Sequence, residues 1–279
     1  MSIETIDTSD PAWVDDPRLA NYRELRDPAL VKQSARFVAE GRMVVTTLLE
    51  DSAMHALSVL VDATAVAAMG DVLLANRDVP IYRVPSGALK EIAGWQFHQG
   101  CLAIGERPEP IDVPTLLERA NQPKLVVALD GVSNPDNVGA IFRSAAGLGA
   151  GGVVLSPSCA SPLYRKAIRS SMGTALRLPF SHGLPWDESL VALREAGHLL
   201  LALDPHGENL EYVLDEIPPE KPRTLILGAE GAGLGDAARE LADWPVAIPM
   251  HYEVDSLNVA AAAAIALYRL EQRSFRRAE

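Results

Sequence analysis

Acidic residues are absent from one long stretch of a chain that is otherwise acidic. Asp and Glu number 37 against 25 Lys and Arg in 279 residues, which gives a formal net charge of −12. Yet no acid occurs from Asn137 to Trp186, where the average of the chain would place several. The basic residues that remain in this stretch are Arg143, Arg165, Lys166, Arg169 and Arg177. An acidic protein that excludes acids from one region and keeps arginines there is expected to hold an anion.

Other residue types are scarce, and each scarcity excludes a class of protein. An aromatic content of 5% disfavours a stacking platform for single-stranded nucleic acid. Cys101 and Cys159 are too few for a disulfide framework or a four-cysteine zinc site, so we expect two reduced, buried thiols. The longest apolar run, residues 259–268, is about half of what spans a bilayer, and residues 1–16 lack the features of a signal peptide. We therefore expect a cytoplasmic protein without membrane contact.

Motifs for several common reaction types are also missing. The histidines lack the spacing of zinc ligands, so no metal is expected, and no G-x-S-x-G elbow is present for a hydrolase. Residues 147–152 fit G-x-G-x-x-G, but they follow a helical pattern and precede a strand, which reverses the order that dinucleotide binding requires. A glycine stop at the end of a helix explains them better, which argues against a nicotinamide oxidoreductase.

Composition and periodicity divide the chain into two domains of α/β class. Residues 1–16 are predicted to be an acidic leader, and residues 17–105 a small α/β domain in which residues 17–50 are helical. The proline-rich residues 106–122 predict a linker. From residue 123 to 279, apolar strands alternate with helices, which indicates a parallel sheet covered on both faces.

The first of three polar loops in the second domain, residues 134–144, follows a buried strand and leads into a helix predicted at residues 140–148. That helix carries Arg143. A helix N-terminus beside an arginine is suited to binding phosphate. The alternative is a structural ion pair of Arg143 with Asp130 or Asp136.

The second and third loops also follow strands. Residues 228–233 place Glu230 among glycines at the carboxyl end of a strand, where α/β sheets bind ligands, although an ordinary strand-to-helix turn is the alternative. Before the last helix, Ser256 is the expected N-cap and Asn258 is expected within the first turn. Alanines at residues 260–264 favour a dimer or ligand interface over solvent. Since these loops offer no nucleophile or metal ligands, a bound cofactor would carry the chemistry.

Together the three loops resemble, in order and spacing, the three motifs of the SpoU/TrmH class of SPOUT RNA methyltransferases, over roughly residues 125–270. The resemblance implies an enzyme that transfers a methyl group from S-adenosylmethionine to a ribose 2′-hydroxyl of RNA. It also implies a homodimer and a deep trefoil knot in the C-terminal domain, a rare exception to unknotted topology. Residues 98–103 resemble the end of an L30e-like substrate-binding domain. The extra domain favours ribosomal RNA, above all 23S rRNA; transfer RNA, or non-catalytic RNA binding on the same fold, are the alternatives.

The resemblance also assigns roles to residues. The side chains that it places near the catalytic centre are Asn137, Arg143, Glu230, Ser256 and Asn258. The positions that it places along the cofactor are Leu203, Gly228, Ile248 and Leu257. The basic residues expected to contact RNA are Arg165, Lys166 and Arg169. Two positions depart from the family's motifs, since Tyr252 stands where glycine is common and Ala260 where serine is frequent.

Overall fold

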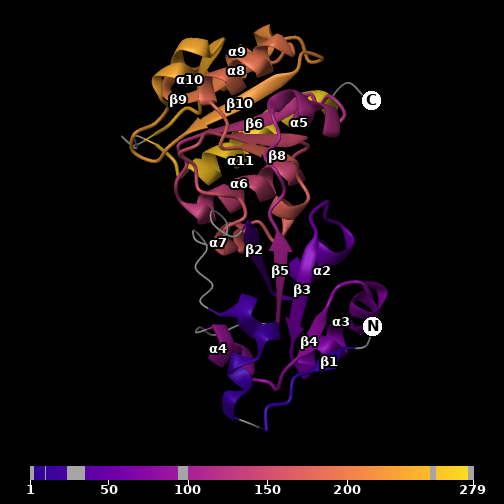
Figure 1. The fold of residues 1–279 in the computed structure, drawn as a ribbon. Helices are drawn as coiled ribbons and strands as arrows, with labels where there is room; N and C mark the ends of the chain where they lie inside the picture. The colour runs from indigo at the N-terminus through magenta and orange to yellow at the C-terminus, as the bar shows by residue number, and fades with distance from the viewer. Residues whose placement is uncertain (1–2, 10, 24–34, 94–99, 252–255, 276–279) are drawn as a thin grey trace. The chain divides into compact units, whose positions relative to one another are not determined.

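The computed structural model describes residues 3–9, 11–23, 35–93, 100–251 and 256–275. The chain forms two compact units (Figure 1). The first comprises Met1–Pro108 and Leu163–Arg177, and the second comprises Glu109–Pro162 and Leu178–Glu279. The segment Leu163–Arg177 therefore belongs to the first unit, although the chain on both sides of it belongs to the second.

The described part of the first unit contains a mixed sheet with the strand order β1-β4-β3-β5-β2. The strands are β1 (Glu4–Thr5), β2 (Arg36–Glu40), β3 (Ala56–Val61), β4 (Ile81–Arg83) and β5 (Cys101–Glu106). The helices are α2 (Arg42–Glu50), α3 (Ala63–Ala75), α4 (Ala88–Ala93) and α7 (Arg165–Ser170), with 3-10 turns η1 (Pro11–Asp15), η2 (Pro17–Tyr22) and η3 (Thr174–Leu176). Strands β1, β4 and β3 pair in parallel, whereas β5 pairs antiparallel with β3 and β2.

The helix expected across residues 17–50 is wrong in its middle, where the chain forms strand β2. Phe37 and Val38 are each 1% exposed, so the strand is buried on both faces. An apolar run buried on both faces cannot be distinguished from a buried helix by its periodicity. Pairing with β5 decides the outcome, and Gly105 stands opposite Phe37 in that pair. A Cβ at Gly105 would lie 2.2 Å from the Phe37 ring, so glycine makes room for it.

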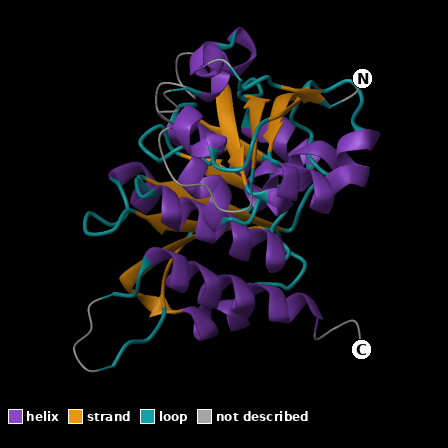
Figure 2. Cartoon of the chain, turned by 90° about the horizontal axis from the view of Figure 1, so that it is seen from below, coloured by secondary structure: helices purple, strands orange, loops and turns teal. Residues whose placement is uncertain are grey.

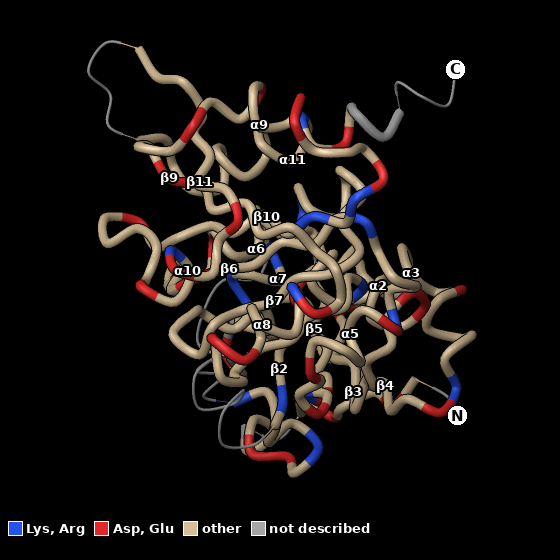
Figure 3. Tube along the Cα trace, turned by 90° about the horizontal axis from the view of Figure 1, so that it is seen from above, with Lys and Arg blue, Asp and Glu red and all other residues tan. Residues whose placement is uncertain are grey.

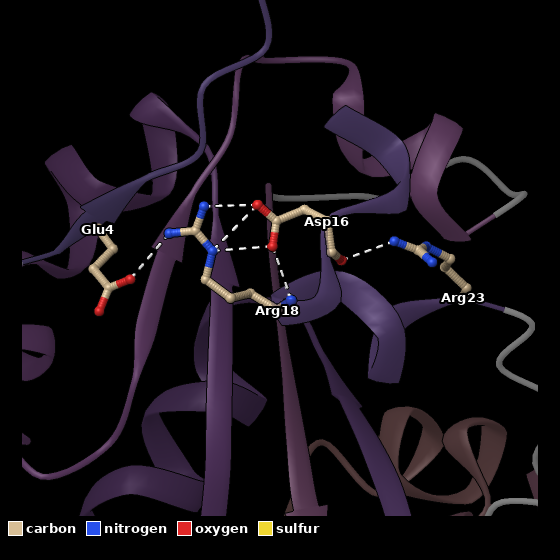
Figure 4. Close-up of polar contacts among 4 residues, drawn as sticks. All are labelled: Glu4, Asp16, Arg18 and Arg23. Atoms are coloured by element: carbon tan, nitrogen blue, oxygen red, sulfur yellow. Dashed lines mark hydrogen bonds and ion pairs between the residues drawn. The ribbon is translucent and has the colours of Figure 1, made fainter. Parts of the chain in front are cut away.

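The N-terminal residues are part of the first unit's core. Leu19 and Tyr22 are fully buried among side chains of the sheet. On the surface above them, the Arg18 guanidinium contacts the carboxylates of Asp16 at 2.7 Å and Glu4 at 3.2 Å (Figure 4). The hydrogen bonds from Arg18 lower the pKa of Asp16 to about 2. These contacts fasten the beginning of the chain to the small sheet.

The described part of the second unit contains a sheet with the strand order β11-β9-β10-β6-β7-β8, and every pair in it is parallel. The strands are β6 (Leu125–Asp130), β7 (Gly152–Leu155), β8 (Phe180–His182), β9 (Leu199–Asn209), β10 (Arg223–Gly228) and β11 (Trp244–Ala247). The helices are α5 (Val113–Arg119), α6 (Pro135–Gly147), α8 (Trp186–Glu195), α9 (Leu210–Glu216), α10 (Asp236–Leu241) and α11 (Val259–Phe275). The predicted parallel sheet is confirmed.

Helices cover both faces of this sheet (Figure 2). Val126 and Ala128 of β6 pack into one core with α5, α8 and α10. The alternate residues Val127 and Leu129 are equally buried and face the other side, where α6 and α11 pack against the sheet and each other. No helix in the described ranges is long and apolar enough to cross a membrane.

Both cysteines are free and buried, as expected from the sequence. Burial raises the pKa of the Cys101 thiol to about 12 and raises that of Cys159 as well. A thiol with a raised pKa is a weak nucleophile at neutral pH. Both cysteines therefore serve as core residues.

Candidate functional site

The order of the strands brings two of the polar loops to one place. Strands β6, β7 and β8 run to one side of the sheet, and β10, β9 and β11 lie on the other. The order of the strands therefore reverses between β6 and β10, and parallel sheets bind ligands at the carboxyl ends of strands at such a point. Asp130 and Gly228, the last residues of β6 and β10, are aligned in the sheet. The loops that follow them start side by side.

Helix α6 begins at this edge of the sheet. Pro135 occupies its first turn, and the Asn134 side chain accepts a hydrogen bond from the Asp136 amide at 2.9 Å. The helix predicted at residues 140–148 thus starts too late, because proline and an asparagine cap are favoured signals for the start of a helix. The earlier start places Asn137 in the first turn, where its side chain is buried.

Asn258 joins the three polar loops. Its side-chain Nδ2 donates to Asn137 Oδ1 at 3.1 Å and to Glu230 Oε1 at 2.8 Å. We refer to these three residues as the polar network. The structure thus brings together three of the five side chains expected near the catalytic centre.

Asn258 also begins helix α11. Its Oδ1 accepts hydrogen bonds from the amides of Ala260 at 3.0 Å and Ala261 at 3.3 Å. The expectation that Ser256 caps this helix, with Asn258 inside its first turn, is therefore wrong. Asparagine is at least as good an N-cap as serine, so propensity could not decide between them. Ala260 takes part in this cap through its backbone N–H, so a serine hydroxyl is not needed at this position for the cap to form.

The side chain of Asn137 has one hydrogen-bond donor that is not used within the described part of the chain. Its Oδ1 accepts from Asn258, whereas its Nδ2 is buried and has no hydrogen-bond partner among the described residues. Buried polar atoms in folded proteins almost always have a partner, and an exception calls for an explanation. A ligand acceptor at this point would supply one.

The other two side chains expected near the centre lie outside the polar network. Arg143 is exposed on α6, and neither Asp130, Asp136 nor any other described residue pairs with it. The structural ion pair considered as the alternative role is thus not formed. Ser256 is also exposed and makes no side-chain hydrogen bond within the described part of the chain.

Residues 229–235, here called the glycine loop, hold Glu230 over the end of β10. Ala229 and Gly233 exchange two backbone hydrogen bonds of 2.9 Å. Gly233 adopts a φ of +70°, which favours glycine. A Cβ at Gly228 would lie 2.4 Å from the carbonyl carbon of Gly233, so no other residue fits there without moving the loop.

The residues expected to line the cofactor lie in or after the three adjacent strands β10, β9 and β11. Leu203 of β9 is half-buried and pairs with Leu227 of β10, one residue before Gly228. Ile248 is half-buried directly after β11, and Leu257 is exposed before α11. Tyr252 lies outside the described residues.

Sequence reasoning missed two groups at the same edge of the sheet. Ser156, directly after β7, accepts a hydrogen bond from the Gly131 amide at 2.9 Å. The sequence suggests Asp130 only as a partner for Arg143, yet its Oδ2 accepts from the Gly235 amide at 2.8 Å. A polar residue at the carboxyl end of a buried strand is the signal that could have identified both.

The residues expected to contact RNA lie on α7, in the first unit. Arg165 binds the carboxylate of Glu40, with an Nη1–Oε2 distance of 2.7 Å, and Glu40 is 6% exposed. Lys166 and Arg169 are exposed and, three positions apart on a helix, share a face. Figure 3 colours the basic and acidic positions along the chain trace. The acid-free stretch therefore contributes to both units, with Arg143 in the second.

The part of the chain that the structure describes holds no group of three or more His, Cys, Asp or Glu side chains that could bind a metal ion.

Comparisons with known proteins agree on one family. Residues 124–268 match the model of the SpoU rRNA Methylase family. An uncharacterized tRNA/rRNA methyltransferase of Mycobacterium bovis is 38% identical over 269 residues, which cover 94% of this chain and 91% of that relative.

Solved structures show the same fold along nearly the whole chain. A structure of an AdoMet-bound rRNA methyltransferase from Sinorhizobium meliloti matches with a TM-score of 0.78 and 22% identity, covering 97% of this chain and 98% of that one. The SpoU methyltransferase AviRb from Streptomyces viridochromogenes, in complex with AdoMet, matches with a TM-score of 0.75 and 25% identity, covering 93% and 98%.

Proposed function

The chain belongs to the SpoU rRNA methylase family, and from this we propose that it transfers a methyl group from S-adenosylmethionine to a ribose 2′-hydroxyl of RNA. The observation that carries the proposal is the polar network of Asn137, Glu230 and Asn258. It joins all three motif loops at the sheet edge where ligands bind in this type of fold. Three unrelated loops would not be expected to meet at one side-chain amide, as these loops do at Asn258.

The site has features that fit S-adenosylmethionine. The spare Nδ2 donor of Asn137 is suited to an oxygen acceptor of the cofactor. Gly228 lets the glycine loop fold back over the end of β10, because a Cβ there would meet the backbone of Gly233. The apolar surface that the cofactor would contact comes from Leu203, Ile248 and Leu257. AdoMet is present in the AviRb structure, which supports the same cofactor here. When bound, this cofactor supplies an electrophilic methyl group on a sulfonium centre.

In our mechanism Arg143 acts on the RNA. A guanidinium keeps its proton in proteins, so it is a poor base but a strong partner for phosphate. An exposed arginine without a partner in the described structure is available to clamp the target phosphate. The positive charge would also lower the pKa of the nearby 2′-hydroxyl, and the phosphate or a water would accept its proton.

The remaining residues orient the reactants. Ser256 is exposed beside Asn258, and its hydroxyl would hold the ribose. Asn137 and Glu230 fix Asn258 and the glycine loop, and this arrangement would orient the acceptor hydroxyl toward the cofactor. No residue of the network has to form a covalent bond with the substrate.

We propose ribosomal RNA, specifically 23S rRNA, as the substrate, with transfer RNA as the alternative. Support comes from the first unit, an additional α/β body that we propose to be an L30e-like RNA-binding domain at residues 17–105. We propose residues 106–122 as the segment that links the domains, although its helix α5 packs in the core of the second unit. We propose residues 123–279, apart from Leu163–Arg177 in the first unit, as the methyltransferase domain, with a trefoil knot in it.

A homodimer is the form that we propose for the enzyme. Ile265 and Tyr268 on α11 are 42% and 50% exposed, and Ala261 is exposed one turn before them. Positions spaced by four and three residues share one helix face, so α11 presents an apolar stripe to solvent. An apolar stripe of this kind is typical of an interface.

Replacing Lys166 and Arg169 together with alanine is expected to weaken RNA binding and flatten its salt dependence. Each phosphate contact adds about 0.7–0.9 to the slope of log affinity against log salt, so the slope should fall by roughly 1.5. Filter binding from low to high salt measures this. Arg119→Ala with Arg194→Ala, which removes two exposed charges from the second unit, is the matched control. Equal losses in both variants would mean a general charge effect and contradict an RNA surface on α7.

The activity itself is tested by incubating the protein with methyl-labelled S-adenosylmethionine and separated rRNA and tRNA. Label in rRNA that protects the neighbouring linkage from alkaline cleavage is expected, because a 2′-O-methyl group removes the attacking hydroxyl. Such label in tRNA alone would select the alternative substrate. RNA binding without label in either pool would mean a non-catalytic RNA-binding protein.

A further inference from the structure

The glycine loop is held on both sides by strands next to the one that it follows. Strand β10 lies between β9 and β6 in the sheet. Strand β6 ends in Asp130, and strand β9 contains Asp204. Both aspartates lie at the level of the loop. Neither aspartate belongs to the polar network.

On the β6 side, Asp130 Oδ2 accepts the Gly235 amide hydrogen at 2.8 Å. A Cβ at Gly235 would come within 3.1 Å of the same oxygen, so the loop backbone lies directly against the carboxylate. A hydrogen bond to an ionised acceptor is among the stronger kinds. This contact fixes the far end of the loop.

On the β9 side, the anchor is an ion pair. Arg239 of α10 donates through Nη1 to Asp204 Oδ2 and through Nε to the Leu234 carbonyl at 3.1 Å. The other oxygen of Asp204 accepts from the His206 amide at 3.0 Å. Burial raises the pKa of Asp204, but these hydrogen bonds outweigh burial and hold it below its ordinary value. One guanidinium thus connects the end of the loop to β9.

These anchors act next to the residues expected to line the cofactor. Asp204 follows Leu203, and the glycine loop follows Gly228. Within the loop, the two Ala229–Gly233 hydrogen bonds leave few backbone groups free to rearrange. A change at either anchor would therefore shift the loop as a body against the cofactor site.

We propose that Asp130 and the Asp204–Arg239 pair are positioning residues that hold the glycine loop in the shape that binds the methyl donor. The inference rests on the proposed function, since it takes S-adenosylmethionine as the ligand. The anchors touch the loop and not the reacting atoms, so they set the affinity for the donor and not the rate of transfer.

Opposite charges in the pair allow this role to be distinguished from simple electrostatics. Asp204→Asn leaves a spare positive charge near the site, whereas Arg239→Gln leaves a spare negative one. The methyl donor carries a sulfonium cation, which a nearby positive charge repels and a negative charge attracts. A purely electrostatic effect would therefore have opposite signs in the two variants, and loss of loop geometry the same sign.

The test is calorimetric binding of S-adenosylmethionine to the full chain, with RNA methylation measured in parallel. Asp204→Asn, Arg239→Gln and Asp130→Ala are each expected to raise Kd and KM for the donor about tenfold, or about 1.4 kcal/mol, with kcat at saturating donor little changed. Asp130→Asn should retain most of the affinity, because its amide oxygen can still accept from Gly235. Arg194→Gln breaks the Arg194–Asp243 pair, a salt bridge of the same unit beside the amino end of β9, and is the control for stability.

Three results would overturn the inference. Opposite shifts in Kd for Asp204→Asn and Arg239→Gln would assign the effect to charge. Wild-type affinity in all three variants would show that the loop needs no anchors. Failure of the wild-type chain to bind S-adenosylmethionine would overturn the proposed function as well, whereas the first two results would leave it standing.

Discussion

Replacing Arg143 with alanine is expected to lower RNA methylation by about a hundred- to a thousandfold, the range seen when one preorganised charge-stabilising donor is removed. Affinity for S-adenosylmethionine should stay unchanged, because Arg143 is exposed and lies outside the polar network. Thermal stability should also stay unchanged, since no described residue pairs with this side chain. Single-turnover methylation, donor calorimetry and a thermal melt on one preparation measure all three.

Arg143→Lys is the matched control for this prediction. Lysine keeps the positive charge but cannot grip a phosphate with two parallel hydrogen bonds. Partial activity is therefore expected, above that of the alanine variant and below wild type. A loss of donor affinity equal to the loss of turnover would contradict the role in RNA binding and place Arg143 at the cofactor.

Replacing Asn258 is expected to separate two roles of one side chain. Asn258→Asp keeps the oxygen that caps α11 but loses the Nδ2 donor, and it sets a second carboxylate beside Glu230. Turnover should fall about a hundredfold, as expected when reacting groups are misplaced, while stability stays near wild type. Asn258→Ala removes the cap as well. Its free energy of unfolding should therefore fall by a further ~1 kcal/mol, which lowers Tm by about 2–4 °C.

Methylation rates and thermal melts of the two variants check this. The polar network would be irrelevant to catalysis if Asn258→Asp retained wild-type turnover. Equal melting temperatures for the aspartate and alanine variants would argue instead that the cap contributes little. Ser256→Ala, a neighbouring exposed side chain that caps nothing, serves as the control for stability.

Much of the second unit could be predicted from its sequence. Strands β6 and β7 lie in the region where apolar runs predict strands, because a short apolar run buried on both faces has a clear start and end. Strand β8 and helices α9 and α10 could not be predicted, because each is too short to show a repeating pattern of apolar residues. Strand β2 was mistaken for helix since its partner, β5, is distant in sequence.

The candidate site was predictable as a set of residues but not as a set of bonds. Asn137, Glu230 and Asn258 were recognisable because polar side chains follow strands, and the parallel sheet gathers such ends. That one amide would connect the other two depends on side-chain geometry over a separation of 121 residues, which no local pattern encodes. The anchors Asp204 and Arg239 were missed because the pairing of a strand-end acid with a helix arginine is visible only once the sheet order is known.

The segment Leu163–Arg177 has a consequence for how the protein is made. The first unit is incomplete until residue 177 has left the ribosome, because Glu40 has no guanidinium before Arg165 emerges. Loss of one partner from a buried ion pair costs about 3–5 kcal/mol, which is a large share of the stability of a small unit. An expression fragment that stops at Pro108 would carry this defect permanently. The two units are thus interdependent during synthesis, and the first cannot be finished before residues 109–162 of the second have been translated.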